Sequence, residues 1–91
     1  MPPIVLYVRP GCHLCTESQA VIVALLAERA AQGGEPVTLV ERDISTNPSW
    51  EQLHFAEIPV IEVGDRRLAL AISPRAVRRF LDDVLGPVPA A

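Results

Sequence analysis

The order of apolar segments in the first 42 residues constrains the fold more than any other feature of the sequence. Ile4–Val8 is a continuous apolar run rich in β-branched residues, which is typical of a strand buried on both faces. The segment Arg9-Pro10-Gly11 breaks this run, and residues 12–32 favour a helix that ends at Gly33-Gly34. Residues 37–42 again favour a strand. A strand, a helix and a strand in this order predict a βαβ unit with parallel strands and a right-handed crossover.

The two longer predicted helices differ in how their apolar residues are spaced. Residues 20–27 of the first helix are apolar without interruption, so we expect this helix to be covered on most sides. The last helix begins after the capping residue Ser73 with Pro74 at its first position, and Gly86-Pro87 follows its end. Its apolar residues recur at helical spacing, which predicts one buried face made of Val77, Phe80, Leu81, Val84 and Leu85.

The middle of the chain predicts a short helix and two further strands. Capping and turn-forming residues at 45–48 precede a short helix from Ser49 to His54 or Phe55. Residues 58–63 and 68–72 are strand candidates, and residues 64–67 between them suit an antiparallel hairpin. We therefore expect residues 1–91 to form a single α/β domain in the order β-α-β-α-β-β-α, with a mixed four-stranded sheet flanked by helices. Its ordered core would span about residues 4–85, followed by a frayed tail at residues 86–91.

Composition excludes several classes of function. The chain of 91 residues has eight arginines, no lysine and a net charge of -3, which argues against non-specific binding to nucleic acid. No apolar run approaches the ~18 residues of a membrane span, and no signal sequence is recognisable at the N-terminus. We therefore expect a cytoplasmic monomer that binds neither nucleic acid nor membrane. In such a reducing compartment, two closely spaced cysteines are more often catalytic or metal-binding than structural.

The two cysteines lie in Cys12-His13-Leu14-Cys15, at the point where the first helix begins after the buried strand and the turn. Free backbone N–H groups at a helix N-terminus stabilise an anion, so they are expected to lower the pKa of the Cys12 thiol. Cys15 lies one turn along on the same face, close enough to form a disulfide with Cys12. The pattern indicates thiol–disulfide exchange, in which Cys12 attacks a substrate disulfide and Cys15 resolves the mixed disulfide.

Other interpretations of this pair stay open. A protonated His13 would further favour the Cys12 thiolate, whereas an exposed His13 at the helix start would have little effect. A zinc site needs four ligands, and the chain offers Cys12, Cys15, His13 and the distant His54. Because His13 stands between the two cysteines, it can hardly complete one tetrahedron with both, and no metal site within one chain is expected. The two cysteines could also be inert.

A second constellation is Glu57-Ile58-Pro59-Val60, where a proline begins an otherwise central strand. These residues alone are explained by an ordinary trans peptide bond before Pro59, with the strand starting at an edge. Taken with the segment from Tyr7 to Cys15, Ile58-Pro59-Val60 resembles the thioredoxin superfamily and specifically its glutaredoxin-like branch. The resemblance covers about residues 4–85. Gly11 stands where thioredoxins proper carry a tryptophan.

This resemblance implies a sheet order and a set of site residues. The sheet order would be 2-1-3-4, with the cysteines at the C-terminal end of the first strand. Pro59 would be the cis-proline that faces the cysteines, and the backbone of Ile58 would pair with a bound substrate. The remaining implied roles are substrate binding for Tyr7 and Gly11, and tuning of the pKa of the Cys12 thiol for Arg9 and His13.

One departure from the glutaredoxin pattern concerns glutathione. Glutaredoxins carry a glycine pair before the last helix, which grips the γ-glutamyl carboxylate, whereas this chain has Ala71-Ile72-Ser73. Glu57 also places a negative charge two residues before Pro59, where glutaredoxins often have threonine. We therefore expect weak glutathione-dependent activity. Arg75, at the start of the last helix, is a candidate for binding an acidic partner.

The leading hypothesis is a dithiol–disulfide oxidoreductase that reduces protein disulfides as a small electron carrier, with no bound cofactor. Glutathione or a flavoprotein reductase would supply its electrons. A second hypothesis is a carrier of a metal or an iron–sulfur cluster, bridged by the Cys12 thiolates of two chains. A third is a redox-inert binding module with a thioredoxin fold.

Overall fold

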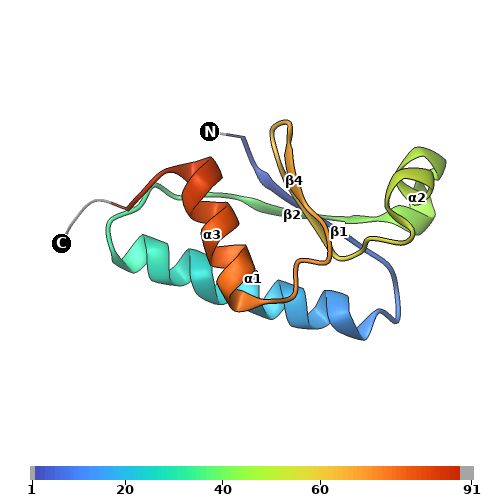
Figure 1. Ribbon diagram of the computed structural model, residues 1–91, viewed down its shortest axis with the longest axis horizontal. Coiled ribbons are helices and arrows are strands. Elements are labelled where there is room, and N and C mark those ends of the chain that lie inside the picture. The colour runs from blue at the N-terminus through green and yellow to red at the C-terminus, as the bar shows by residue number, and fades with distance from the viewer. Residues whose placement is uncertain (1, 89–91) are drawn as a thin grey trace.

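Capping residues set the starts of the helices in the computed structural model, which describes residues 2–88 (Figure 1). The Oγ atom of Ser73 accepts a hydrogen bond from the N–H of Ala76, and Oδ1 of Asn47 accepts one from the N–H of Ser49. In chain order the elements are β1 (Ile4–Val8), α1 (His13–Ala31), β2 (Leu39–Asp43), the 3-10 turn η1 (Ile44–Thr46), α2 (Pro48–His54), β3 (Val60–Val63), β4 (Arg66–Leu68) and α3 (Pro74–Leu85).

The four strands form one mixed sheet in the order β2-β1-β3-β4. β1 pairs in parallel with β2, as the predicted βαβ unit requires, and antiparallel with β3. The hairpin of β3 and β4 completes the sheet at the other edge. In this register Tyr7 lies opposite both Arg42 of β2 and Val60 of β3. The predicted α/β fold and the sheet order 2-1-3-4 are therefore confirmed.

Alternate residues of β1 face opposite sides of the sheet. Ile4 and Leu6 pack into the main core under α1 and α3, whereas Val5 and Tyr7 pack into a smaller cluster with Ile44. Figure 1 shows α1 and α3 crossing one another, with α2 apart from them at one end of the molecule. The other buried residues of the main core are Ile22, Leu25, Ile61, Val63, Ala71, Val77, Phe80 and Leu81.

The expectation that α1 is covered on most sides is wrong. Its buried residues are Cys15, Ser18, Ile22 and Leu25, which form a single stripe. Most of the apolar run at residues 20–27 lies outside this stripe, and the side chain of Val23 is 52% exposed. The sheet and α3 cover α1 from one direction only, and alanines add apolar character without needing burial.

The last strand lies earlier than predicted. Residues 68–72 were expected to form it, but β4 is Arg66–Leu68. Gly64, with a φ of 60°, and Asp65 suffice to reverse the chain, so pairing begins with Arg66 opposite Val63. Beyond β4, Leu70 has a φ of 50° and its N–H bonds to the carbonyl of Glu57 instead of continuing the ladder.

The other boundaries differ from the predictions by smaller amounts. β2 begins at Leu39 rather than at residue 37, and β3 begins at Val60 rather than at residue 58. Pro59 has no N–H to offer to a neighbouring strand, which explains the later start of β3. α1 begins at His13 because Cys12 is its N-cap, and α2 begins at Pro48, the first position after its N-cap.

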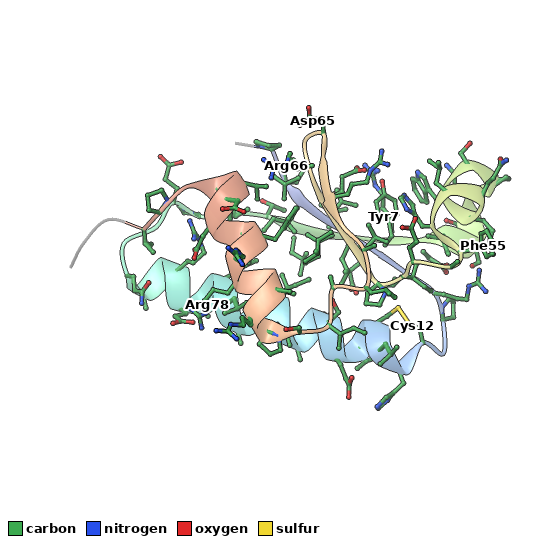
Figure 2. The ribbon with its side chains drawn as sticks, in the orientation of Figure 1. Tyr7, Cys12, Phe55, Asp65, Arg66 and Arg78 are labelled. Carbon is green, nitrogen blue, oxygen red and sulfur yellow. A yellow bond between two sulfur atoms is a disulfide. The ribbon has the colours of Figure 1, made fainter. Side chains whose placement is uncertain are left out.

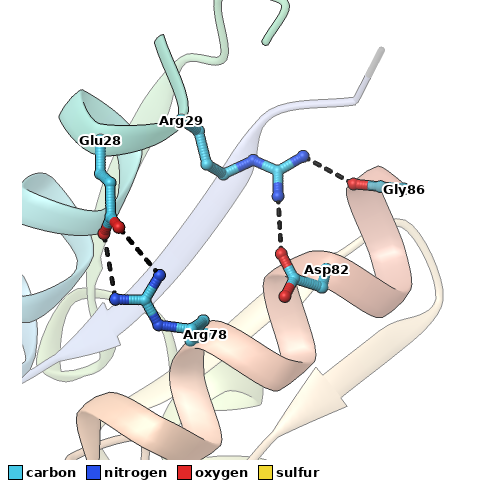
Figure 3. Close-up of polar contacts among 5 residues, drawn as sticks. All are labelled: Glu28, Arg29, Arg78, Asp82 and Gly86. Carbon is cyan, nitrogen blue, oxygen red and sulfur yellow. Dashed lines mark hydrogen bonds and ion pairs between the residues drawn. The ribbon is translucent and has the colours of Figure 1, made fainter. Parts of the chain in front are cut away.

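Two arginines join α1 to α3 at the end away from the cysteines (Figure 3). Arg29 donates to the carboxylate of Asp82 at 2.9 Å and to the backbone carbonyl of Gly86 at 2.7 Å. Arg78 makes a two-pronged pair with Glu28, at 3.1 and 3.0 Å. The start of the tail expected to fray is thus held at Gly86, and residues 89–91 lie outside the described part of the chain. Within residues 2–88, no helix has the length and apolar character needed to cross a membrane.

Candidate active site

The loop between β1 and α1 positions Cys12 at the helix N-terminus. Gly11 has a φ of 74°, a conformation that glycine adopts without strain, and it turns the chain directly before Cys12. The N–H of Cys12 donates to the carbonyl of Arg9 at 3.2 Å. The Sγ atom of Cys12 accepts a hydrogen bond from the N–H of Cys15 at 3.1 Å, so it takes the place of the usual oxygen cap. Gly11 therefore sets the entry of the chain into the helix, and its implied role in substrate binding stays a prediction.

Cys12 and Cys15 form a disulfide, with their Cα atoms 5.2 Å apart (Figure 2). The two sulfur positions differ in access, because Cys12 is partly exposed whereas Cys15 is only 4% exposed. A thiol of another molecule can approach Cys12 more readily than Cys15. Cys12 is therefore the outer sulfur and Cys15 the inner one, while the attacking role of Cys12 and the resolving role of Cys15 stay predictions.

A surface hollow of about 460 Å³ opens beside this disulfide. Both cysteines line it, together with Arg9 and Gly11 of the preceding loop. Gln19 of α1 and Glu41 of β2, whose side chains are hydrogen-bonded at 3.2 Å, also line it. The sequence did not indicate these two residues. They are 22 positions apart, and no local pattern shows that a side chain of the helix contacts a side chain of the following strand.

The bond between Ile58 and Pro59 is cis, as the resemblance implied. Pro59 is fully buried, and it directly precedes Val60, which pairs with Tyr7. The proline therefore lies at the sheet edge where β1 ends and the loop to Cys12 begins. Ile58 is half-buried at the same edge.

Three residues that sequence reasoning missed connect the proline segment to α1. The N–H of Leu70 donates to Glu57 O at 2.9 Å, and the N–H of Ala71 donates to Pro59 O at 2.8 Å. The carbonyl of Ala71 accepts a hydrogen bond from Ser18 Oγ at 2.6 Å. The one available signal was Ser18 itself, a hydroxyl three residues after Cys15 on the buried face of the helix.

The structure places Tyr7 in the interior rather than at a surface that a substrate can reach. The residue is 3% exposed, and its ring centroid lies 4.2 Å from that of His54. Its hydroxyl donates to Glu62 and accepts from Arg42, both at 3.0 Å. Burial, followed by the hydrogen bond to Glu62, raises the pKa of Tyr7. The alternation of β1 explains this position, since Tyr7 points into the smaller core cluster.

The two residues expected to tune the pKa of the Cys12 thiol also have other partners. Arg9 forms an ion pair with Glu51 of α2, which directs its guanidinium toward that helix. His13 has an 84% exposed side chain, and its Nε2 lies 3.3 Å from a carboxylate oxygen of Glu17. Both residues line the hollow with Cys12. Their influence on the thiol stays a prediction.

Within residues 2–88, no three His, Cys, Asp or Glu side chains lie together in an arrangement that could hold a metal ion. His54, the most distant of the four zinc ligands considered above, is buried against Tyr7.

Comparison with known proteins decides the family. A family model described as Glutaredoxin-like domain matches residues 3–85. The chain belongs to this family. Its membership in the glutaredoxin-like branch of the thioredoxin superfamily, expected from the cysteine and proline segments, is therefore confirmed. A comparison with curated protein sequences finds no significant match.

Solved structures of other proteins share the fold of this chain. Protein XcR50 from X. campestris is 25% identical with a TM-score of 0.65, over 88% of this chain and 96% of its own. Protein Ne2328 from Nitrosomonas europaea is 27% identical with a TM-score of 0.64, over 94% of this chain and 89% of its own. The germline-specific thioredoxin Deadhead from Drosophila melanogaster is 13% identical with a TM-score of 0.60, over 89% of this chain and 78% of its own. This last likeness concerns the fold alone.

Proposed function

We propose that this glutaredoxin-like domain is a thiol–disulfide oxidoreductase that reduces protein disulfides through Cys12 and Cys15. The observation that carries the proposal is the disulfide at the start of α1, in which Cys12 is partly exposed and Cys15 is buried. A redox pair needs one sulfur that a substrate can reach and a second sulfur close enough to displace it. The family assignment and the position of Pro59, next to the end of β1 that leads to Cys12, support the same function.

The reaction has two exchange steps. The thiolate of Cys12 attacks one sulfur of a substrate disulfide, so that a bond to Cys12 forms, the substrate bond breaks and the leaving sulfur takes up a proton. Cys15 then loses its proton and attacks Cys12, which forms the internal disulfide and releases the second substrate sulfur as a thiol. The substrate gains two electrons and the domain loses two. The N–H of Cys15, 3.1 Å from Cys12 Sγ, would stabilise the attacking thiolate.

An external thiol donor must return the two electrons. We propose a flavoprotein reductase or a protein dithiol in this role, and weak turnover with glutathione. Two features of the structure favour this choice: Ala71 is fully buried where glutaredoxins have a glycine pair, and Glu57 is exposed beside Leu70. The negative charge of Glu57 would repel the anionic tripeptide. The cytoplasm is a reducing compartment that would supply a flavoprotein reductase or a protein dithiol. We therefore propose that the protein is cytoplasmic.

The paired cysteine variants test the mechanism. With dithiothreitol as donor, Cys12→Ser should lower the reduction of a protein disulfide such as that of insulin to the rate of dithiothreitol alone, because the attacking sulfur is gone. In a separate incubation of the reduced variant with the substrate and no other thiol, Cys15→Ser should accumulate a mixed disulfide, visible by mass spectrometry, because no second thiol resolves it. Equal residual activity in both variants would refute these roles. A visible absorption band after loading with iron and sulfide would instead favour the cluster-carrier hypothesis.

A second assay tests the donor. Reduction of hydroxyethyl disulfide is followed once with glutathione and its reductase and once with thioredoxin reductase. We expect the flavoprotein route to be faster. Saturable turnover at low millimolar glutathione would show that Ala71 and Glu57 do not prevent glutathione binding.

A further inference from the structure

The hollow beside the disulfide contains a carboxylate without a counter-ion. Apart from the cysteines, the titratable side chains that line it are those of Arg9, His13 and Glu41. Arg9 is paired with Glu51 of α2, and His13 lies against Glu17 of its own helix. In the part of the chain that the structure describes, no arginine or histidine forms an ion pair with Glu41. The negative charge of Glu41 is therefore available to a ligand that enters the hollow.

Strand alternation and one hydrogen bond direct this carboxylate toward the hollow. Glu41 pairs with Leu6 of β1, whose side chain packs into the main core under α1, so Glu41 lies on that face of the sheet. The next residue, Arg42, lies on the opposite face, where it donates to the hydroxyl of Tyr7. The side-chain amide of Gln19 in α1 donates to Oε2 of Glu41 at 3.2 Å. Gln19 thus orients the carboxylate of Glu41, and both side chains stay exposed to solvent.

The hollow has room for one long side chain of a bound polypeptide. Its volume of about 460 Å³ lies within the range of about 300–1,000 Å³ that is usual for small-molecule sites. The partly exposed Cys12 and the carboxylate of Glu41 line the same hollow. When a cysteine of a polypeptide is bonded to Cys12, a neighbouring residue of that polypeptide can extend its side chain into the hollow toward Glu41.

We propose that Glu41 is a specificity-determining residue that binds the guanidinium of an arginine next to the reactive cysteine of a polypeptide disulfide. This inference rests on the proposed function and adds the class of substrate that the domain prefers. A guanidinium is planar and has five N–H donors, so it can donate both to the carboxylate of Glu41 and to the side-chain carbonyl of Gln19. The hydrogen bond to Glu41 would be charge-assisted. An acidic substrate residue in the hollow would instead be repelled by the like charge of Glu41.

Two synthetic peptides test this specificity. Each contains one internal disulfide, and the residue after each cysteine is arginine in one peptide and citrulline, the uncharged counterpart of arginine, in the other. For the unmodified protein we expect a KM about fivefold lower for the arginine peptide, which is equivalent to about 1 kcal/mol. The preference should shrink at high salt, because a partly exposed ion pair is screened.

Glu41→Gln is the decisive variant, because it removes the charge and keeps the size of the side chain. With this variant we expect equal KM values for the two peptides. Glu35→Gln is the matched control, since Glu35 is also exposed but lines a separate hollow beyond the other end of α1. It should keep the fivefold preference. Equal KM values with the unmodified protein, an undiminished preference in Glu41→Gln, or an equal loss of preference in both variants would overturn the assignment of Glu41.

A binding measurement separates this inference from the proposed function. Both peptides are prepared with serine in place of their cysteines and titrated to millimolar concentration into the isotope-labelled protein, and the side-chain amide signal of Gln19 is followed by NMR. A shift with the arginine peptide that is about fivefold weaker with the citrulline peptide supports the inference, even if the protein reduces no disulfide. Absence of this difference overturns it, whereas failure to reduce any disulfide overturns only the proposed function.

Discussion

The hydroxyl of Ser18 donates a hydrogen bond to the backbone carbonyl of Ala71, with 2.6 Å between the two oxygens and both residues fully buried. Ala71 in turn donates its N–H to the carbonyl of Pro59. Two consecutive hydrogen bonds thus connect α1, one turn after Cys15, with the cis-proline. This hydroxyl therefore adds a direct polar link between the helix that carries the cysteines and the segment that carries Pro59.

Ser18→Ala should therefore lower both stability and substrate affinity. The change leaves the buried carbonyl of Ala71 without its side-chain donor, which we expect to cost about 1–3 kcal/mol in the free energy of unfolding. Urea denaturation measures this loss, and KM for a protein disulfide should rise because the proline segment is no longer fixed to α1. The exposed Ser49 provides a control, since Ser49→Ala should leave both quantities nearly unchanged. A Ser18→Ala protein as stable as the control would contradict this role of the hydrogen bond.

The sequence was sufficient to predict the features of the site that depend on local order. A buried strand, a turn with Gly11 and a cysteine at a helix start follow one another in the chain, and each has a local physical cause. The link from Ser18 to Ala71 spans 53 positions. No local pattern indicates it, because a buried serine looks the same in sequence whether its partner is in its own helix or elsewhere.

The misplaced last strand has a related cause. Residues 68–72 alternate in size and are apolar, which is the pattern of a strand, and this pattern continues through Leu70. In the structure, the carbonyls of Glu57 and Pro59 accept hydrogen bonds from the backbone N–H groups of Leu70 and Ala71, so strand pairing in the hairpin ends before these residues. Tertiary hydrogen bonds therefore override a local preference for strand. As a result Leu70 has a positive φ, a conformation for which glycine is the residue expected from sequence.

Leu70→Gly should reveal the strain of this conformation. Glycine adopts a φ of 50° without a clash of its Cβ, so removing the strain should offset the added flexibility of the unfolded chain. We expect Leu70→Gly to be more stable than Leu70→Ala by about 1 kcal/mol, measured by urea denaturation. The comparison with alanine is the appropriate one, because both variants lose the leucine side chain and only one keeps a Cβ. If the glycine variant proved the less stable of the two, the backbone of Leu70 would not be strained.

The two arginines of Figure 3 should contribute unequally to the packing of α1 against α3. The side chain of Arg29 is only 14% exposed and satisfies both Asp82 and the carbonyl of Gly86 at the end of α3. Its removal in Arg29→Ala should cost about 1–3 kcal/mol, since a hydrogen-bonded and largely buried charge is lost. In Arg78→Ala the loss should be smaller, because Arg78 and Glu28 are both open to solvent, which screens their attraction.

Thermal or urea denaturation of the two variants at low and high salt checks this ranking. The effect of Arg78→Ala should shrink further in 0.5 M salt, whereas most of the effect of Arg29→Ala should persist. Equal losses in the two variants would show that burial of Arg29 adds nothing.

His54 should make the stability of the domain depend on pH. Burial against Tyr7 lowers the pKa of His54, and the positive charge of Arg67 lowers it further, although Glu62 and Glu57 act in the opposite direction. The folded protein therefore binds this proton less readily than the unfolded chain, whose histidine titrates near pH ~6.5. The stabilising contribution is complete above that pH and is lost as the pH falls toward the lower pKa of the folded state.

The urea midpoint should consequently decrease between pH 7.5 and 5, and this decrease should be smaller in His54→Phe. Phenylalanine keeps an aromatic ring beside Tyr7 but cannot take up a proton, so the comparison isolates the titration from the packing. His13→Phe retains His54 and should preserve the decrease. An identical pH dependence in the His54→Phe protein would assign the effect to other groups. The protonation of His54 would also affect the candidate site. The carbonyl of His54 accepts hydrogen bonds from the N–H groups of Glu57 and Ile58 at 2.9 and 3.2 Å. If protonation loosens the end of α2, these hydrogen bonds would no longer hold the segment that leads to Pro59.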